Sequence, residues 1–344
     1  MLTALLQELE GRQAYLSGAP IQSVYFGGGT PSILPVSDLV SLFEQVARCY
    51  AVSGDAEITL EANPDDLTLE KLQDLRRYTP VNRLSIGIQS FQEADLQWMN
   101  RAHNAREAHT CLDAARRMGF DDLTIDLIYG APVTSDADWA ENLRLAFDYD
   151  IPHLSCYCLT VEEGTALHHF VKTQKMAPVE EEKAARQFEY LMDTASANGY
   201  EQYEISNFAR HQRYARHNSS YWLGQTYLGI GPSAHSYDGQ SRQWNIAHNP
   251  RYIEGILNNS PAYEREVLTP QNLYNEYVMT ALRTMRGVDC RQLALKGDFA
   301  VRHFTGNIAP FLDNGSVEVS DGCYYLTRKG KLMADSITAA LFVV

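Results

Sequence analysis

A run of glycines near the amino terminus has the composition of a ligand-binding turn. Gly27-Gly28-Gly29-Thr30 directly follows a short apolar segment over residues 23–26. A glycine backbone can approach a ligand to hydrogen-bonding distance because no side chain intervenes. Carboxylate and ammonium groups are typical ligands of such a turn at the mouth of a parallel sheet. The run alone fits an ordinary turn equally well, so its meaning depends on the residues around it.

Further polar residues end other apolar segments in the same manner. They are Glu61, Asn63, Gln89, Asp126 and Glu204. In a parallel α/β barrel, side chains from many strands converge on the rim at the carboxyl ends. Ordinary strand termination explains one or two of them, whereas Glu61, Gln89 and Asp126 together favour a binding site. Carboxylates and amides suit hydroxyl and ammonium groups, and Arg101 could hold a carboxylate. A nucleoside joined to an amino acid carries all of these groups.

Alternating strands and helices are needed to position these residues. Strands are predicted over 23–26, 57–61, 83–89, 123–128, 153–159 and 202–205. Ser37 and Thr68 are predicted to cap the first two intervening helices, and later helices are predicted from about 105 to 119, around Trp139 and over 180–197. This repeat predicts an α/β fold with a parallel sheet, open or closed into a barrel.

The pattern changes twice in the last third of the chain. An irregular stretch rich in aromatic residues and glycine begins at 206, and helices return from about 268. A hairpin is predicted to turn at Asp321-Gly322, with a final helix after Thr327. Helices followed by a small hairpin predict a winged-helix-like module. We therefore divide the chain into 1–205, 206–267 and 268–344.

Composition limits the classes of partner. The chain has 344 residues and a formal net charge of −14, which argues against a nucleic-acid partner because phosphate binding needs a basic patch. No apolar run approaches the length of a membrane span and no signal peptide is recognisable, so a cytoplasmic protein is expected. The six cysteines include no Cys-x-x-Cys pair, and small buried thiols are the simplest interpretation of them.

Five motifs occur in an order that resembles a known family. They are Tyr25-Phe26-Gly27-Gly28-Gly29-Thr30-Pro31-Ser32, Glu61-Ala62-Asn63-Pro64, Ser85-Ile86-Gly87-Ile88-Gln89-Ser90-Phe91, Met99-Asn100-Arg101 and Ile125-Asp126-Leu127-Ile128-Tyr129-Gly130. Over essentially the whole chain the sequence resembles the radical S-adenosylmethionine (SAM) family of oxygen-independent coproporphyrinogen III oxidases and their HemW relatives. The resemblance implies a partial (β/α) barrel with a C-terminal helical, winged-helix-like domain. It also implies SAM binding by Gly28, Gly29, Thr30, Glu61, Gln89, Arg101, Asp126 and Cys158.

A sixth motif distinguishes between branches of this family. His217-Asn218-Ser219-Ser220-Tyr221-Trp222 matches the His-Asn-x-x-Tyr-Trp pattern of the HemW branch, the haem chaperones. The resemblance implies that His217 holds haem for delivery to haem-accepting proteins, including acceptors at membranes. A neutral imidazole flanked by aromatic residues is a reasonable axial ligand for haem iron. The alternative function is that of the oxygen-independent oxidase, which decarboxylates coproporphyrinogen III.

The sequence departs from the family at the iron–sulfur cluster. Radical SAM chemistry needs three cysteines in a Cys-x-x-x-Cys-x-x-Cys loop after the first barrel strand, and neither that loop nor that strand is present. A 4Fe-4S cluster is therefore expected in a full-length form only, with Met1 an internal residue of the natural protein. A cluster-free homologue is the alternative. Translation of the coding frame upstream of Met1 would distinguish them, because an incomplete chain predicts the cysteine motif before any stop codon.

Overall fold

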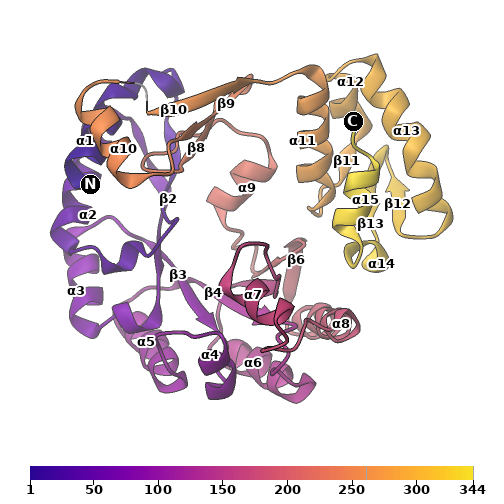
Figure 1. Cartoon of the computed structure of the whole chain (residues 1–344), viewed down its shortest axis with the longest axis horizontal. Helices are drawn as coiled ribbons and strands as arrows, with labels where there is room; N and C mark the ends of the chain where they lie inside the picture. Colours follow the sequence, from indigo (N-terminus) through magenta and orange to yellow (C-terminus); the bar gives the residue numbers. More distant parts are fainter. Residues whose placement is uncertain (261, 344) are drawn as a thin grey trace. The chain divides into compact units, whose positions relative to one another are not determined.

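Figure 1 shows the seven-stranded sheet, whose strands carry Glu61, Gln89, Asp126 and Glu204. The computed structural model describes residues 1–260 and 262–343. The strands are β1 (Ile21–Phe26), β2 (Val52–Ala62), β3 (Arg83–Gln89), β4 (Asp122–Tyr129), β5 (His153–Cys158), β6 (Tyr200–Glu204) and β7 (Asn207–Arg210), in the spatial order β1-β2-β3-β4-β5-β7-β6. Strands β2 to β5 pair in parallel. The predicted parallel sheet is confirmed over these four strands.

The end of the sheet differs from the predicted repeat. Strand β7 lies between β5 and β6 and pairs antiparallel with both of them. The chain therefore turns back in a hairpin after β6 and inserts β7 beside β5. With only four residues, β7 is too short to show a periodic pattern in the sequence.

The connecting helices follow the apolar spacing of the sequence. They are α1 (Leu2–Gly11), α2 (Val36–Cys49), α3 (Leu69–Tyr78), α4 (Glu93–Trp98), α5 (Ala105–Arg117), α6 (Asp136–Asp148), α7 (Ala166–Lys172) and α8 (Glu181–Ala197). Thr68 caps α3 as predicted, with its hydroxyl accepting from the Lys71 amide at 3.2 Å. The prediction for Ser37 is wrong: α2 begins at Val36 after Pro35, and no side chain caps it. The short helices α4 and α7 were not predicted.

The remaining elements form two small antiparallel sheets with helices. The first contains β8 (His235–Tyr237), β9 (Ser241–Asn245) and β10 (Tyr263–Val267), accompanied by α9 (Arg216–Trp222) and α10 (Asn249–Leu257). The second contains β11 (Val288–Asp289), β12 (Val317–Ser320) and β13 (Cys323–Leu326), with α11 (Pro270–Leu282), α12 (Cys290–Ala294), α13 (Asp298–Asp313), α14 (Arg328–Lys331) and α15 (Ala334–Ala340). Asp321 and Gly322 turn the β12–β13 hairpin with φ of 51° and 78°, as predicted.

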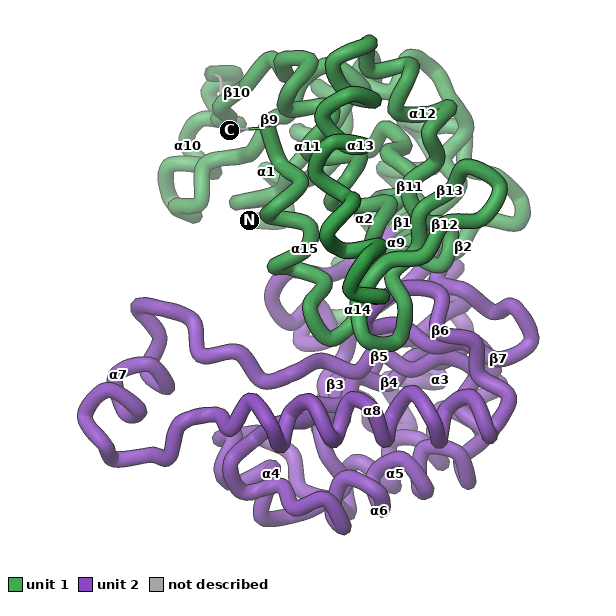
Figure 2. The backbone as a smooth tube through the Cα atoms, turned by 90° about the vertical axis from the view of Figure 1, so that its right-hand side faces the viewer, with its two compact units in different colours: residues 1–24, 34–57, 216–344 green, residues 25–33, 58–215 purple. Residues whose placement is uncertain are grey.

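Contacts divide the chain into two compact units (Figure 2). Unit 1 contains 1–24, 34–57 and 216–344, and unit 2 contains 25–33 and 58–215. Unit 2 has its core along the parallel strands, where Leu84, Ile86 and Ile125 are fully buried. The division at 205 and 267 stays a prediction. Within the described ranges, no helix has both the length and the apolar character needed to cross a membrane.

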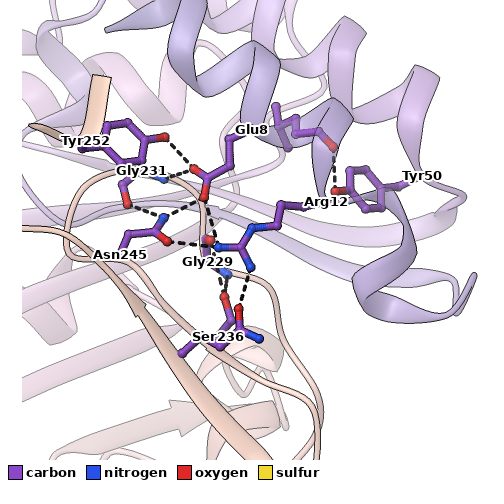
Figure 3. Close-up of polar contacts among 10 residues, drawn as sticks. Glu8, Arg12, Tyr50, Gly229, Gly231, Ser236, Asn245 and Tyr252 are labelled. Carbon is purple, nitrogen blue, oxygen red and sulfur yellow. Dashed lines mark hydrogen bonds and ion pairs between the residues drawn. The ribbon is translucent and has the colours of Figure 1, made fainter. Parts of the chain in front are cut away.

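A buried carboxylate organises part of unit 1 (Figure 3). The Glu8 side chain on α1 accepts hydrogen bonds from the Gly231 amide at 2.9 Å, Asn245 Nδ2 at 2.7 Å and Tyr252 Oη at 2.5 Å. Arg12, which directly follows α1, lies 3.6 Å from the same carboxylate. Burial, followed by the bond to Glu8, holds the pKa of Tyr252 above its ordinary value. These bonds join α1 to the loop after α9, to β9 and to α10.

Removing this carboxylate is expected to destabilise the protein. In Glu8→Ala, the buried donors of Gly231, Asn245 and Tyr252 lose their shared acceptor, and we expect a loss of about 2–4 kcal/mol of unfolding free energy. Urea unfolding monitored by circular dichroism measures it. Glu10→Ala is the control because Glu10 is exposed on the same helix. Equal stability of the two variants would contradict the structural role of Glu8.

Candidate ligand-binding sites

The glycine turn after β1 is built around one carboxylate of β2. Tyr25 Oη donates to Glu61 Oε1 at 2.6 Å, and the Gly28 amide donates to Glu61 Oε2 at 3.3 Å. A Cβ atom on Gly27 would lie 2.8 Å from Glu61 Oε1 and 2.5 Å from the Tyr25 ring, so a side chain cannot be accommodated there without displacement. Gly28 and Gly29 have φ of 73° and 143°, values that residues with a side chain rarely adopt. The turn therefore requires glycine at each of its three positions.

A second set of contacts fixes the far end of this turn. Ser32 is fully buried, and its hydroxyl donates to Asp66 Oδ2 at 2.6 Å. The same hydroxyl accepts from the Asn63 amide at 3.3 Å, and Lys71 Nζ donates to the Ser32 carbonyl. Burial lowers the pKa of Lys71. The turn is thus tied to the residues that follow β2, which limits its freedom to move away from Glu61.

Three polar side chains converge over Gly87 in β3. A Cβ atom on Gly87 would lie 2.8 Å from Gln89 Nε2, 3.4 Å from Arg101 Nη2 and 3.6 Å from Asn63 Oδ1. Arg101 Nη2 donates to Asn63 Oδ1 at 2.7 Å, whereas Arg101 Nε is buried without a hydrogen-bond partner. Gln89 ends β3 with a φ of 64°. A buried guanidinium N–H without a partner is costly, and an anionic or polar ligand group would satisfy it.

Asp126 on β4 is a carboxylate whose pKa departs from its ordinary value. Its burial, followed by the nearby charge of Glu61, raises its pKa to about 7. The Ser155 hydroxyl and the positive charges of Arg83 and Arg101 act in the opposite direction and do not restore the ordinary value. A cationic ligand close to Asp126 and Glu61 would favour the ionised form of both carboxylates.

The other two residues implied by the family resemblance are peripheral to these contacts. Thr30 follows the glycine turn, and its carbonyl accepts from the Ile33 amide at 3.1 Å. Cys158 ends β5, and a Cβ atom on Gly130 would lie 3.3 Å from its Sγ. The interpretation of the cysteines as buried thiols holds for Cys111 and Cys156 and is wrong for Cys158, which is exposed.

Sequence reasoning missed the residues that hold the ligand-facing groups in place. The sequence predicts Tyr25 and Ser32 only as the first and last residues of a motif, and it predicts no role for Ser155. Tyr25 on β1 bonds to Glu61 on β2, and Ser155 on β5 is the register partner of Asp126 on β4, so the pairing of strands was needed to find them. Glu204 was predicted with the rim residues, but its carboxylate accepts from Asn207 Nδ2 at 2.6 Å and from the Ser206 amide at 2.9 Å. It shapes the β6–β7 hairpin.

A separate polar and aromatic group surrounds His217 in unit 1. His217 Nδ1 lies 2.9 Å from Ser23 Oγ of β1. The imidazole packs edge-on against Tyr221 at a centroid distance of 5.0 Å, and Tyr221 packs against Tyr227 at 4.6 Å. Burial lowers the pKa of His217 to about 4. The imidazole is therefore neutral at physiological pH, which is the form that coordinates a metal.

Comparison with known proteins defines the class of this chain. The Radical SAM superfamily matches residues 5–146 and the HemN C-terminal domain matches residues 268–333. The solved structure of coproporphyrinogen III oxidase (HemN) from Escherichia coli superposes with a TM-score of 0.84 at 23% identity, covering 99% of this chain and 82% of that one. The chain thus has the radical SAM fold with a HemN-type C-terminal domain, which confirms the predicted partial barrel.

Closer relatives identify the family. The heme chaperone HemW of Bacillus subtilis is 32% identical, with 98% of this chain and 90% of the relative covered. HemW of Mycobacterium tuberculosis is 33% identical, with 99% and 85% covered. HemW of Synechocystis is also 33% identical, over 84% of this chain and 70% of the relative. The chain belongs to the HemW family of radical SAM proteins.

The cysteines of this chain do not fit the cluster that the radical SAM family implies. All six are free thiols, and they are distributed over α2, α5, β5, α12 and β13. Among residues 1–260 and 262–343, no three His, Cys, Asp or Glu side chains are grouped as metal ligands. Three thiolates from one loop or face are needed to bind a 4Fe-4S cluster.

Substitution of Asp126 is expected to change how stability depends on pH. Because the folded-state pKa lies near 7 and the unfolded value near 3.8, the folded protein binds more protons than the unfolded chain between these values. Ionisation of Asp126 therefore destabilises the fold as pH rises toward 7. Asp126→Asn removes that effect, and we expect it to be about 2–4 kcal/mol more stable than the wild type at pH 8. The gain should vanish near pH 4.

Urea unfolding at pH 4, 6 and 8 measures this difference. Asp113→Asn, which alters an exposed carboxylate on α5, is the control and should show no such trend. A constant difference between Asp126→Asn and the wild type at all three pH values would contradict the raised pKa.

Proposed function

We propose that this protein is a haem chaperone, which binds haem through His217 and delivers it to haem-requiring proteins. The observation that carries the proposal is the near full-length similarity to several proteins named heme chaperone HemW. The neutral, anchored imidazole of His217 supports it, because such a group is suited to axial coordination of haem iron. The likeness to coproporphyrinogen III oxidase, at 23% identity, concerns the fold alone.

We further propose that the rim residues of unit 2 bind SAM. The Gly28 and Gly29 backbone and the carboxylates of Glu61 and Asp126 are suited to the ammonium and hydroxyl groups of this ligand. The buried Arg101 Nε, which lacks a hydrogen-bond partner, supports a polar ligand at this site. Bound SAM would supply an adenosyl group on a sulfonium. In this chain the rim residues bind and orient that ligand.

Haem coordination by His217 can be tested by substitution. We expect His217→Ala to lower haem affinity by about tenfold or more and to shift the Soret band, because the axial nitrogen is lost. Titration with hemin, followed by difference absorbance, measures both quantities. His235→Ala is the control, since His235 is exposed and lies beside Trp244. Similar losses in the two variants would show that haem is bound elsewhere.

The SAM site predicts a pH-dependent affinity for a cationic ligand. Ionised Asp126 attracts the cation, so SAM affinity should rise from pH 6 to pH 8 as the carboxylate loses its proton. Glu61→Gln should weaken binding by about tenfold, because one of the two carboxylates becomes neutral. Isothermal titration calorimetry measures both effects. Glu70→Gln, at an exposed position of α3, is the control, and wild-type affinity in Glu61→Gln would count against the site.

A further inference from the structure

The helix that carries His217 cannot fix this residue by itself. Helix α9 has seven residues, and all of them are half-buried or exposed. A helix of two turns is only marginally stable in isolation because few hydrogen bonds offset the cost of nucleation. The position of the imidazole must therefore depend on contacts that α9 makes with other elements. Two such contacts come from the strands β1 and β2.

Glu57 on β2 binds the first turn of α9 through both carboxylate oxygens. Its Oε2 accepts from the Arg216 amide at 2.8 Å, and its Oε1 accepts from the His217 amide at 2.9 Å. The side chain is only 4% exposed. A carboxylate at a helix amino terminus satisfies amide groups that lack partners within the helix and interacts favourably with the helix dipole. Glu57 therefore holds the backbone of His217 directly.

A neighbouring contact of Arg216 supports the same arrangement from outside. Its guanidinium Nη1 lies 3.1 Å from Asp55 Oδ2, and Nη2 donates to the Asp55 carbonyl at 2.5 Å. Both of these groups are exposed, so water screens the pair and its contribution is small. The buried carboxylate of Glu57 is thus the dominant attachment of α9 to β2.

Ser23 on β1 acts on the imidazole ring itself. Its Oγ lies 2.9 Å from His217 Nδ1. When the hydroxyl accepts a hydrogen bond from Nδ1–H, the neutral ring carries its lone pair on Nε2, the nitrogen that could coordinate a metal. Residues that bind the second nitrogen of a ligating histidine fix its tautomer and orientation and increase its basicity. Tyr221 packs edge-on against the ring and limits its rotation.

We propose that Glu57 and Ser23 are positioning residues that hold His217 with Nε2 as the ligand of haem iron. Glu57 fixes the backbone of the histidine, and Ser23 fixes the plane of the ring and can accept the hydrogen bond from Nδ1–H when Nε2 binds iron. This inference rests on the proposed function, because it assumes that His217 binds haem. It adds two residues that lie 160 or more positions before the His-Asn-x-x-Tyr-Trp motif.

The experiment measures the iron–histidine bond as well as haem affinity. Hemin is added to purified wild-type protein and to the Ser23→Ala, Ser23→Thr, Glu57→Gln and His217→Ala variants. Resonance Raman spectra of the reduced complexes give the iron–histidine stretching frequency. We expect Ser23→Ala to lower this frequency and to weaken haem binding by about tenfold, because the acceptor for Nδ1–H is lost. Ser23→Thr retains the hydroxyl and should restore the wild-type frequency.

Glu57→Gln tests the second positioning residue. An amide offers one acceptor oxygen in place of two, so one of the two amide groups at the start of α9 loses its bond. We expect a weaker or heterogeneous iron–histidine signal together with lower haem affinity. Ser37→Ala and Glu44→Gln are the matched controls, since both positions are exposed on α2 of the same unit. Should Glu57→Gln fail to fold, the comparison of Ser23→Ala with Ser23→Thr still decides the role of Ser23.

The outcomes separate this inference from the proposed function. Unchanged haem binding in His217→Ala would overturn the function assigned to His217. Loss of binding in His217→Ala, with wild-type frequency and affinity in Ser23→Ala and Glu57→Gln, would overturn the inference alone. A lower frequency in Ser23→Ala that Ser23→Thr reverses would support it, because a purely structural role of Ser23 does not change the iron–nitrogen bond.

Discussion

Carboxylates withdrawn from water determine how this acidic chain is organised. A buried carboxylate must receive hydrogen bonds or positive charge, or else it takes up a proton. Glu8 and Glu57 accept hydrogen bonds from backbone amides of distant segments. These bonds join the distant segments to α1 and to β2. Glu61 accepts hydrogen bonds from Tyr25 Oη and from the Gly28 amide, and these bonds shape the glycine turn. Burial of Asp126, followed by the nearby charge of Glu61, raises its pKa to about 7.

The two proposed sites depend on the same pair of strands. Strand β1 carries Ser23, which contacts His217, and two residues later Tyr25, which bonds to Glu61. Strand β2 carries Glu57, which holds α9, and four residues later Glu61 itself. Because side chains alternate along a strand, residues separated by two or four positions share one face. Ser23 and Tyr25 thus share one face of β1, and Glu57 and Glu61 share one face of β2.

The sequence predicted those parts of the fold that rest on local patterns. Strand β3 was predicted with its observed bounds, Arg83–Gln89, because alternating apolar residues end there in a polar one. Thr68 was recognised as a cap because the apolar helix pattern begins directly after it. The glycine turn was predicted because three consecutive glycines directly follow a predicted strand and polar residues end the other predicted strands in the same manner. For Thr68 and β3, the residues that determine the structure are neighbours in the sequence.

The sequence did not predict those parts that depend on distant partners. No sequence pattern around Glu57 indicates that it binds the amides of Arg216 and His217. Likewise, no pattern around Ser23 indicates its contact with the imidazole. Strand β7 is defined by pairing with β5 and β6 more than by its own four residues. The backbone of Gln89, with a φ of 64°, follows from the end of the strand and not from a preference of glutamine.

The separation of 194 residues between Ser23 and His217 imposes an order on biosynthesis. At translation rates of 5–20 residues per second, about 10–40 s pass between synthesis of the serine and synthesis of the histidine. Strands β1 and β2 have left the ribosome by then, before α9 is synthesised. Until that point Ser23 and Glu57 lack the partners that α9 provides. A nascent chain therefore cannot form the contact between Ser23 and His217 until α9 has been synthesised.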